Sequence, residues 1–290
     1  MRIAVTGAGG FLGTHLLRQL RARFPDAHLS GVVRSSPAHS VVGVTYAQRL
    51  EPADYTLHLA GGGSVGGSLR DPVADLLLNT RGTVEVLEQL RTVGTGRLVI
   101  ASSAAVYGRL EGLVSEGQPA SPVSPYGVSK LASELYVHAY ESLHGLDACV
   151  ARIGNAYGPG QRQLAIYDLA RRALRESPPL RLHGTGEEVR DFIHASDVAD
   201  SLIIIAQAGH RGATYNVASG HPVSMKDVAR MIALAAGHEE DDVTTDGSAE
   251  PGKANVFCPS IQLLTELGFE PGVSLEQGIV ETMEWVRCDR

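Results

Sequence analysis

Three evenly spaced glycines near the start of the chain constrain its fold more than any other feature. A short apolar run at residues 3–6 leads into Gly7, Gly10 and Gly13, and an amphipathic stretch begins at about Phe11. Glycines at this spacing permit a tight strand-to-helix turn and let a pyrophosphate approach the backbone, where the helix N-terminus favours negative charge. We therefore predict a dinucleotide site on Gly7, Gly10, Phe11, Leu12 and Gly13.

Short apolar runs alternate with longer amphipathic stretches in the first half of the chain. Runs at 29–33, 56–60 and 97–101 are separated by helical stretches such as 73–93. This alternation predicts an α/β fold with a doubly wound (Rossmann) parallel sheet and a smaller C-terminal substrate-binding subdomain. The expected boundaries are 1–155 plus about 194–219 for the dinucleotide-binding domain, and about 156–193 and 220–290 for the interleaved subdomain.

The charge balance and the cysteines limit the partners and the location. Thirty-two acidic against 25 basic residues give a net charge of −7, so no broad basic surface is expected to attract nucleic acid or a membrane. No apolar run is long enough to span a bilayer, and three cysteines without C-x-x-C spacing fit a reducing compartment. We predict a cytoplasmic protein with inert thiols and assign no metal site.

The end of the second predicted strand bears on the choice of cofactor. A carboxylate there accepts hydrogen bonds from the adenosine ribose of NAD, but this chain has Arg34 followed by two serines. An arginine beside hydroxyls accommodates a 2′-phosphate, which favours NADP(H) over NAD(H). The alternative is that Arg34 stacks on the adenine or faces solvent.

A tyrosine and a lysine at helical spacing form the clearest catalytic signal. Tyr126 and Lys130 follow Ser124-Pro125, a typical helix start, and a spacing of four places both on one helical face. An ammonium beside a phenol favours the phenolate, so we expect a lowered tyrosine pKa and general acid/base chemistry near neutral pH. The chain contains only three lysines, which makes this coincidence informative.

A serine pair completes the predicted catalytic set. Ser102 and Ser103 end the apolar run that closes at Ala101, so their hydroxyls belong at the edge where doubly wound sheets bind ligands. We select Ser103 over Ser102 as the group that holds a substrate oxygen while Tyr126 transfers the proton. Helix or turn capping is the alternative role for such a serine.

These motifs, taken in order, resemble the extended short-chain dehydrogenase/reductase family, in its nucleotide-sugar epimerase, dehydratase and ketoreductase branch. The similarity runs nearly end to end. It also includes segments at residues 58–61, 79–83, 152–160, 190–194 and 215–217.

The resemblance implies further roles. Ala60, Gly61 and Asn79 would line the cofactor, and Lys130 would also bind the nicotinamide ribose. Asn155 and Arg190 would contact a nucleotide-diphosphate sugar, and the planar guanidinium suits a diphosphate. Structural roles are expected for His58, His194, Asp191 and Asp197, and a homodimer paired through the Tyr/Lys helix is expected.

Departures from the family pattern narrow the reaction. Relatives that dehydrate or decarboxylate the sugar carry an acid just after the catalytic serine or threonine, where this chain has Ala104 and Ala105. Relatives that epimerise at C3/C5 or C5 place a cysteine near the serine, and this chain has none there. Chemistry at C4 alone is therefore expected.

Two further departures concern ligand binding. The segment from Arg34 to His58 is shorter than is usual in the family, and its region 40–54 supplies no obvious equivalent of the aspartate that the family places beside the adenine. The C-terminal phosphate-binding Arg-Pro-Gly reads Glu250-Pro251-Gly252, followed by Lys253.

Three functions remain open from the sequence. Arg34 favours an NADPH-dependent ketoreductase that reduces a nucleotide-linked 4-keto hexose. The same residues with bound NAD fit a nucleotide-sugar 4-epimerase. A non-catalytic dinucleotide-sensing protein is a remote third possibility, because such a protein would be expected to lose Tyr126 or Lys130.

Overall fold

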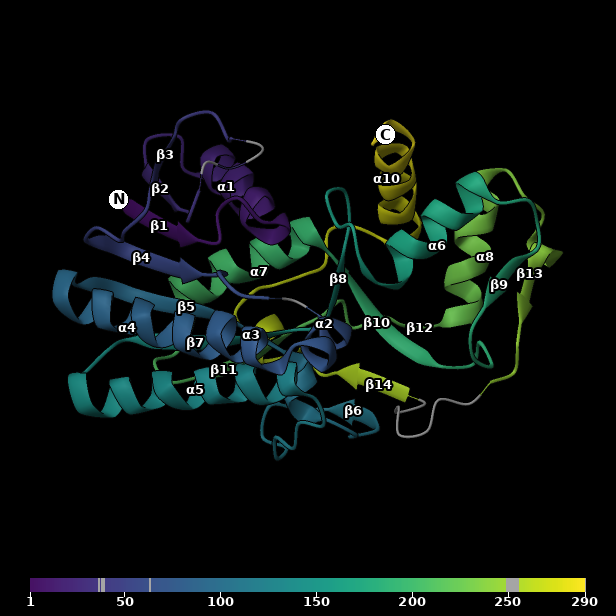
Figure 1. Ribbon diagram of the computed structural model, residues 1–290. Coiled ribbons are helices and arrows are strands. Elements are labelled where there is room, and N and C mark those ends of the chain that lie inside the picture. Colours follow the sequence, from purple (N-terminus) through teal and green to yellow (C-terminus); the bar gives the residue numbers. More distant parts are fainter. Residues whose placement is uncertain (36, 38–39, 63, 249–255, 290) are drawn as a thin grey trace.

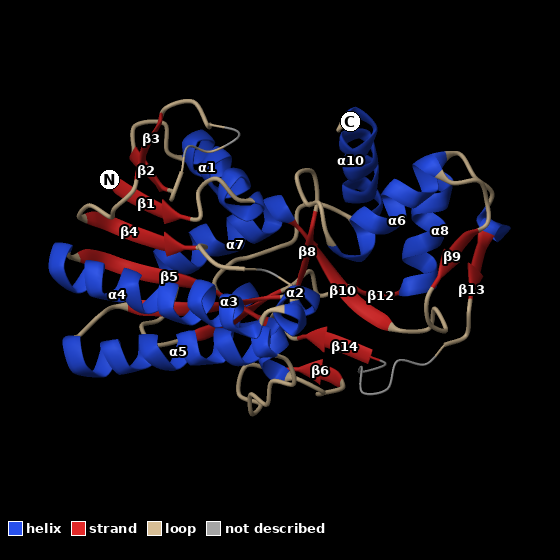
Figure 2. Ribbon diagram, viewed as in Figure 1, coloured by secondary structure: helices blue, strands red, loops and turns tan. Residues whose placement is uncertain are grey.

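The computed structural model describes residues 1–35, 37, 40–62, 64–248 and 256–289. Its larger unit is built on a seven-stranded, fully parallel sheet in the order β11-β7-β5-β4-β1-β2-β3 (Figures 1 and 2). The strands are β1 (Arg2–Thr6), β2 (His28–Val32), β3 (Val44–Ala47), β4 (Ala53–His58), β5 (Thr95–Ser103), β7 (Ala148–Ile153) and β11 (Thr214–Val217).

Helices cover both faces of this sheet. α1 (Phe11–Arg23) and α7 (Ala195–Ala208) pack on one face, and α4 (Gly82–Val93) and α5 (Pro125–His144) on the other. Successive side chains of a strand point to opposite faces, so in β5 Val99 joins the core under α1 and α7, while Leu98 and Ile100 join the core under α4 and α5.

The chain order in the sheet reverses between β1 and β4. The parallel strands end at one edge, which faces the second unit (Figure 1). Ligands bind at such a reversal in doubly wound sheets. Four short elements lie in the chain after β4 and β5, namely α2 (Val65–Arg70), α3 (Pro72–Leu76), η1 (Leu77–Arg81) and η2 (Ala104–Tyr107).

The second unit has its own sheets and its own core. Its strands run in the order β12-β10-β14-β6, with β8 also paired to β10, and β13 pairs with β9. Ile166, Ile232 and Met283 come from its three helices and pack together. The elements are β6 (Gly112–Val114), β8 (Asn155–Tyr157), α6 (Leu164–Arg175), β9 (Leu180–Leu182), β10 (Val189–His194), β12 (Pro222–Ser224), α8 (Met225–Ala236), η3 (Glu240–Asp242), β13 (Val243–Thr245), β14 (Val256–Pro259) and α10 (Leu275–Cys288).

The predicted fold class is confirmed, but the two units interleave more than the predicted boundaries state. β6 belongs to the second sheet although it lies within 1–155. Leu264 of α9 (Gln262–Glu266) and Phe269 pack in the core beside α1 and α7, although both lie within 220–290. Such long-range pairings leave no local periodic signal.

Candidate active site

The three predicted glycines form a close-packed turn between β1 and α1. Gly7 has φ +69°, and a Cβ placed there would lie 2.7 Å from the Ala60 nitrogen. A Cβ on Gly13 would overlap the Gly7 carbonyl oxygen, and the Gly10 amide donates to that same oxygen at 2.9 Å. Gly7 and Gly13 therefore require the absence of a side chain, whereas a Cβ on Gly10 would make a tight contact of 3.2 Å with the Gly7 carbonyl oxygen.

The first turn of α1 presents unpaired amides at this place. Gly10 is the N-cap residue and supplies no side-chain cap, and the first turn contains no acidic residue. Phe11 and Leu12 begin the helix, so their N–H groups lack intrahelical acceptors. An anion bound here is stabilised by these amides and by the helix dipole.

Ser103 and Tyr126 are brought together by the start of α5. Ser124 caps this helix through the Gly127 amide at 3.1 Å, and Pro125 occupies its first turn. Gly127 lets α5 approach η2, because a Cβ there would lie 2.6 Å from the Ala105 carbonyl oxygen. Ser103 consequently lies close enough to Tyr126 for its side chain to affect the pKa of the phenol.

The structure also gives the adjacent serines Ser102 and Ser103 different surroundings. The Ser102 hydroxyl is buried and donates to the Glu134 carboxylate. Glu134 in turn pairs with Arg152 at 2.7 Å. Ser102 therefore belongs to a buried ionic network, and Ser103 is the serine next to the phenol.

The expected lowering of the Tyr126 pKa is wrong for this structure. Burial raises the pKa of the phenol, the neighbouring Ser103 side chain lowers it, and the charge of Asp75 raises it further. Lys130 lies 5.9 Å from the centre of the Tyr126 ring, and its ammonium donates to the Ala101 carbonyl at 2.9 Å. At this distance desolvation of the phenol outweighs the attraction of the ammonium.

Lys130 is itself strongly affected by burial. It is 8% exposed, and burial lowers the pKa of its ammonium to about 8, against the raising effects of Asp75 and Glu134. Lys130 therefore changes charge within about one pH unit of neutrality.

The turn after β4 forms the opposite wall of the site. A Cβ on Gly61 would lie 2.6 Å from Asn79 Oδ1 and 3.3 Å from Lys130 Nζ, so the predicted residues Gly61, Asn79 and Lys130 do meet in space. Ala60 donates its amide to Thr6 Oγ1 at 3.2 Å, and Gly62 donates to Asn79 Oδ1 at 3.0 Å. These two hydrogen bonds hold the turn after β4 next to the glycine turn between β1 and α1.

Asn155 and Arg190, the predicted substrate contacts, lie in the second unit. Asn155 starts β8 and donates its Nδ2 to the Asp191 carbonyl at 2.8 Å. Arg190 lies on β10, is partly buried, and donates to the Val189 carbonyl.

Sequence reasoning missed the cleft beside Asn155. A cavity of about 60 Å³ is formed between the loop after β8, α6 and β10, and Gln163, Leu164 and Tyr167 contribute to its lining. Leu164 has φ +71°, a conformation that is costly for a leucine and that often marks a functional site. A tertiary feature of this kind has no pattern in the sequence.

Comparison with known proteins assigns this geometry to a family. A sequence model described as the NAD dependent epimerase/dehydratase family matches residues 3–218. The chain belongs to this family. It is accordingly an enzyme of the NAD-dependent nucleotide-sugar epimerase/dehydratase type.

The relatives of this epimerase/dehydratase family member divide between two activities. The chain is 29% identical over 315 residues to a dTDP-glucose 4,6-dehydratase of Streptomyces antibioticus, covering 100% of this chain and 93% of that protein. It is 30% identical over 316 residues to a UDP-glucose 4-epimerase of Mycolicibacterium smegmatis, covering 99% of each. The structure of Thermus thermophilus UDP-glucose 4-epimerase in complex with NAD matches with a TM-score of 0.85 and 28% identity over 99% of each chain.

The predicted preference of this family member for NADP is not supported. Arg34 is exposed and forms no hydrogen bond or ion pair with the residues that the structure describes, and the solved relative named above holds NAD. The family model is also described as NAD dependent. Glu250, Pro251, Gly252 and Lys253 lie outside the described residues.

The other predicted structural residues act as expected. His58 contacts Thr6 at 2.6 Å and Thr83 at 3.1 Å, and His194 caps α7 through Ser196. Each of the two aspartates binds a pair of backbone amides: Asp191 those of Ser219 and Gly220, and Asp197 those of Gly272 and Val273. Cys149, Cys258 and Cys288 are free thiols, and burial raises the pKa of the first two.

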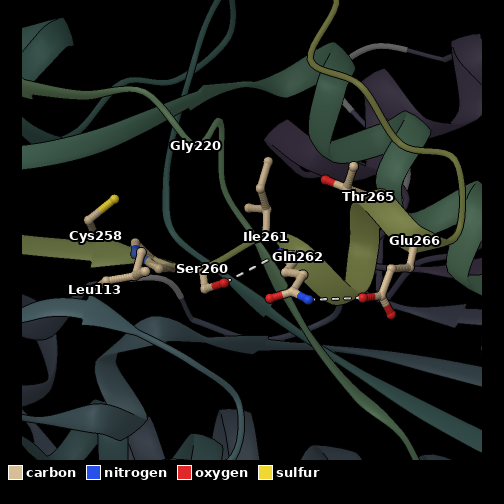
Figure 3. Close-up of a pocket in the computed structure, with 9 residues that line it drawn as sticks. Leu113, Gly220, Cys258, Ser260, Ile261, Gln262, Thr265 and Glu266 are labelled. Carbon is tan, nitrogen blue, oxygen red and sulfur yellow. Dashed lines mark hydrogen bonds between the residues drawn. The ribbon is translucent and has the colours of Figure 1, made fainter.

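A larger cavity lies elsewhere and contains none of the predicted catalytic residues. It has a volume of about 370 Å³ and is lined by Leu113 of β6, by Cys258 of β14, and by Ile261 and Thr265 at α9 (Figure 3). Its hydrogen bonds join Gln262 to Ser260 and to Glu266. The larger of the two cavities is therefore not the one beside a predicted site residue.

Among the described residues, none of the helices combines the length and the apolar character that a membrane span requires.

Proposed function

We propose that this protein is an NAD-dependent nucleotide-sugar 4-epimerase. The main observation behind this proposal is that Tyr126, beside Ser103, is the phenol placed for proton transfer. The two residues that follow Ser103 are Ala104 and Ala105, which cannot transfer a proton. A 4,6-dehydration also needs proton transfer at a second carbon, and alanines supply none. The named 4-epimerases of the comparison support this choice over the ketoreductase that Arg34 favours.

The residues of the glycine turn fit NAD. The turn around Gly7 and Gly13 has no room for a side chain, and the uncapped start of α1 suits a pyrophosphate. Asn79, Gly61 and Lys130 would hold the nicotinamide end. When bound, NAD accepts two electrons and the hydrogen of sugar C4 and returns them, and it adds a positive charge beside the phenol.

The protein residues handle the proton of the sugar 4-hydroxyl. Tyr126 accepts this proton while C4 is oxidised and gives it back when the 4-keto sugar is reduced on its other face, so the proton balance closes. Ser103 donates a hydrogen bond to the same oxygen, and Lys130 as an ammonium favours the phenolate of Tyr126. Inversion requires the 4-keto sugar to turn over within the site.

Arg190 and Asn155 support a nucleotide diphosphate as the anchor of the substrate. A guanidinium binds phosphate oxygens with two parallel donors, and Asn155 on β8 lies beside β10. The named relatives act on UDP-glucose or dTDP-glucose, which supports a pyrimidine nucleoside diphosphate here.

A single incubation tests this function. Purified protein is mixed with UDP-glucose or dTDP-glucose without added cofactor, and C4 epimers are followed by proton NMR. We expect interconversion to equilibrium with no net oxidation of a cofactor. Stoichiometric consumption of NADPH with a 4-keto sugar, and no interconversion of epimers, would replace this proposal with the ketoreductase.

We also propose a homodimer that pairs through α5. Val128, Leu135, Tyr136 and Leu143 are exposed on this helix at a spacing that places them along one side, and exposed Leu76 and Leu77 lie on α3 and η1, which pack against α5. An apolar surface of this kind is favourable when a second copy covers it. Sedimentation velocity should give twice the mass of the 30.7 kDa chain, and a single 30.7 kDa species would contradict the proposal.

A further inference from the structure

Asp75 is a buried acid that the proposed reaction does not use. It lies on α3 and is 8% exposed. Its Oδ1 accepts from Asn79 Nδ2 at 3.0 Å, and its Oδ2 is buried and accepts no hydrogen bond from the described residues. A buried carboxylate needs a compensating positive charge, because transfer from water removes its hydration.

Lys130 is the cation that compensates it. α3 packs against α5, and Asn79, which binds Asp75 at 3.0 Å, lies beside Lys130 Nζ at the Gly61 turn. The charge of Asp75 therefore acts on both Lys130 and Tyr126. An ammonium has three N–H donors, and the hydrogen bond to the Ala101 carbonyl uses one of them. The buried carboxylate of Asp75 and the buried ammonium of Lys130 thus lie in the same region, where α3 packs against α5.

The other charged groups around Lys130 have partners or lie in solvent. Glu134 of α5 is paired with Arg152, and His58 of β4 is neutral because burial and Lys130 lower its pKa to about 3. On the elements packed against α3, Arg70 of α2 and Arg81 of η1 are exposed, as is Asp71 at the start of α3. Asp75 is therefore the acid near Lys130 that has no ion pair of its own.

We propose that Asp75 is a positioning residue of this active site: its carboxylate keeps Lys130 in the ammonium form and orients the Asn79 amide toward the Gly61–Gly62 turn. The proposal rests on the proposed acid/base roles of Tyr126 and Lys130. Asn79 transmits the second effect, since its Nδ2 binds Asp75 and its Oδ1 accepts the Gly62 amide.

Removing the charge of Asp75 has a defined direction. A negative charge favours the ammonium and disfavours the phenolate, so its loss lowers the pKa of Lys130 below about 8 and also lowers the pKa of Tyr126. Both limbs of the pH profile of kcat should then move to lower pH. A purely structural role would reduce the height of the profile without moving it.

The lysine content of the chain permits a direct test. Protein with 13C-labelled lysine has three ε-CH₂ signals, from Lys130, Lys226 and Lys253, which single Lys→Arg variants of the latter two assign. In Asp75→Asn we expect the titration midpoint of Lys130 to fall by about one pH unit. The midpoints of Lys226 and Lys253 should stay unchanged.

Asp71→Asn is the matched control. It removes an exposed charge from the start of the same helix and retains a side chain that caps Ala74. The Lys130 midpoint should equal that of the wild type in this variant and stay near it in Asp75→Glu. Should Asp75→Asn fail to fold, Asp75→Ser replaces it. An unchanged Lys130 midpoint in a folded neutral variant overturns the proposal. Because the titration needs no substrate, it decides this question even if the protein fails to epimerise any sugar.

Discussion

The two edges of the dinucleotide site differ sharply in how they are built. At the β4–β5 edge, His58, Asn79 and Lys130 are 3%, 1% and 8% exposed, and each is hydrogen bonded to a neighbour. At the β2–β3 edge, Arg34 and Ser35 are exposed, and Val42 is 90% exposed.

This difference separates chemistry from cofactor selection. Buried polar groups must satisfy one another, so they hold a single geometry, whereas exposed groups exchange partners with water at little cost. In the proposed mechanism, the β4–β5 edge therefore defines where the proton is transferred. The described residues of the β2–β3 edge, Arg34 and Ser35 among them, are exposed, and we expect them to place few constraints on the ribose of the cofactor.

The largest expected effect is the loss of the phenol at the β4–β5 edge. Tyr126→Phe should lower kcat by about 10²–10⁴-fold, because the general acid/base is removed. Folding and cofactor content should be retained, as judged by circular dichroism and by the cofactor released on denaturation. Tyr136→Phe, on the exposed side of the same helix, is the control and should keep wild-type kcat. Equal activity in the two variants would remove Tyr126 from the mechanism.

The ion pair beneath this edge should have the largest effect on stability. Glu134→Gln leaves Arg152 buried without its charge partner, and we expect the free energy of unfolding to fall by about 3 kcal/mol. Urea denaturation measures it. Glu85→Gln, in an exposed pair with Arg81, should change stability by less than about 0.5 kcal/mol. Similar losses in both variants would show that burial does not distinguish this edge.

A substitution in the glycine turn should have the next largest effect on stability and on NAD binding. Gly13→Ala places a Cβ against the Gly7 carbonyl oxygen, so it should destabilise the protein by about 1–3 kcal/mol and weaken NAD binding. Thermal unfolding with and without NAD gives both quantities. Gly66→Ala is the control, since its Cβ meets only the end of the Arg70 side chain at 3.9 Å. That variant should be neutral or slightly more stable.

The smallest effect should come from the β2–β3 edge. Because Arg34 is exposed and makes no polar contact with the described residues, Arg34→Ala should change the Kd for NAD by less than about threefold, or about 0.6 kcal/mol. Isothermal titration with NAD and NADPH measures this. A large loss of NADPH binding alone would restore the reductase interpretation.

Prediction from the sequence succeeded where the signal is local. The glycine spacing, the helix start at Ser124-Pro125 and the i, i+4 pair of Tyr126 and Lys130 each depend on neighbouring residues, and the structure contains all three features. The juxtaposition of Gly61 with Asn79 was expected from the family resemblance, since no local pattern joins residues 18 positions apart.

The sequence failed mainly to predict the pKa values of the site residues, because these values depend on packing between distant segments. The sequence shows a lysine near a tyrosine but not the depth to which both are buried, so the Tyr126 pKa was predicted to move in the wrong direction. The same limit applies to Asp75, an ordinary acid in the sequence that the contact of α3 with α5 buries next to Lys130.

By itself, the sequence determined the strand-turn-helix that cradles a pyrophosphate and the helix that carries the tyrosine and lysine, because hydrogen-bond geometry and steric limits act over a few residues. Only the tertiary structure decided which of two adjacent serines lies next to the phenol and which buried acid accompanies the lysine. Those outcomes follow from desolvation and long-range contact, which arise only when the sheet and its helices pack together.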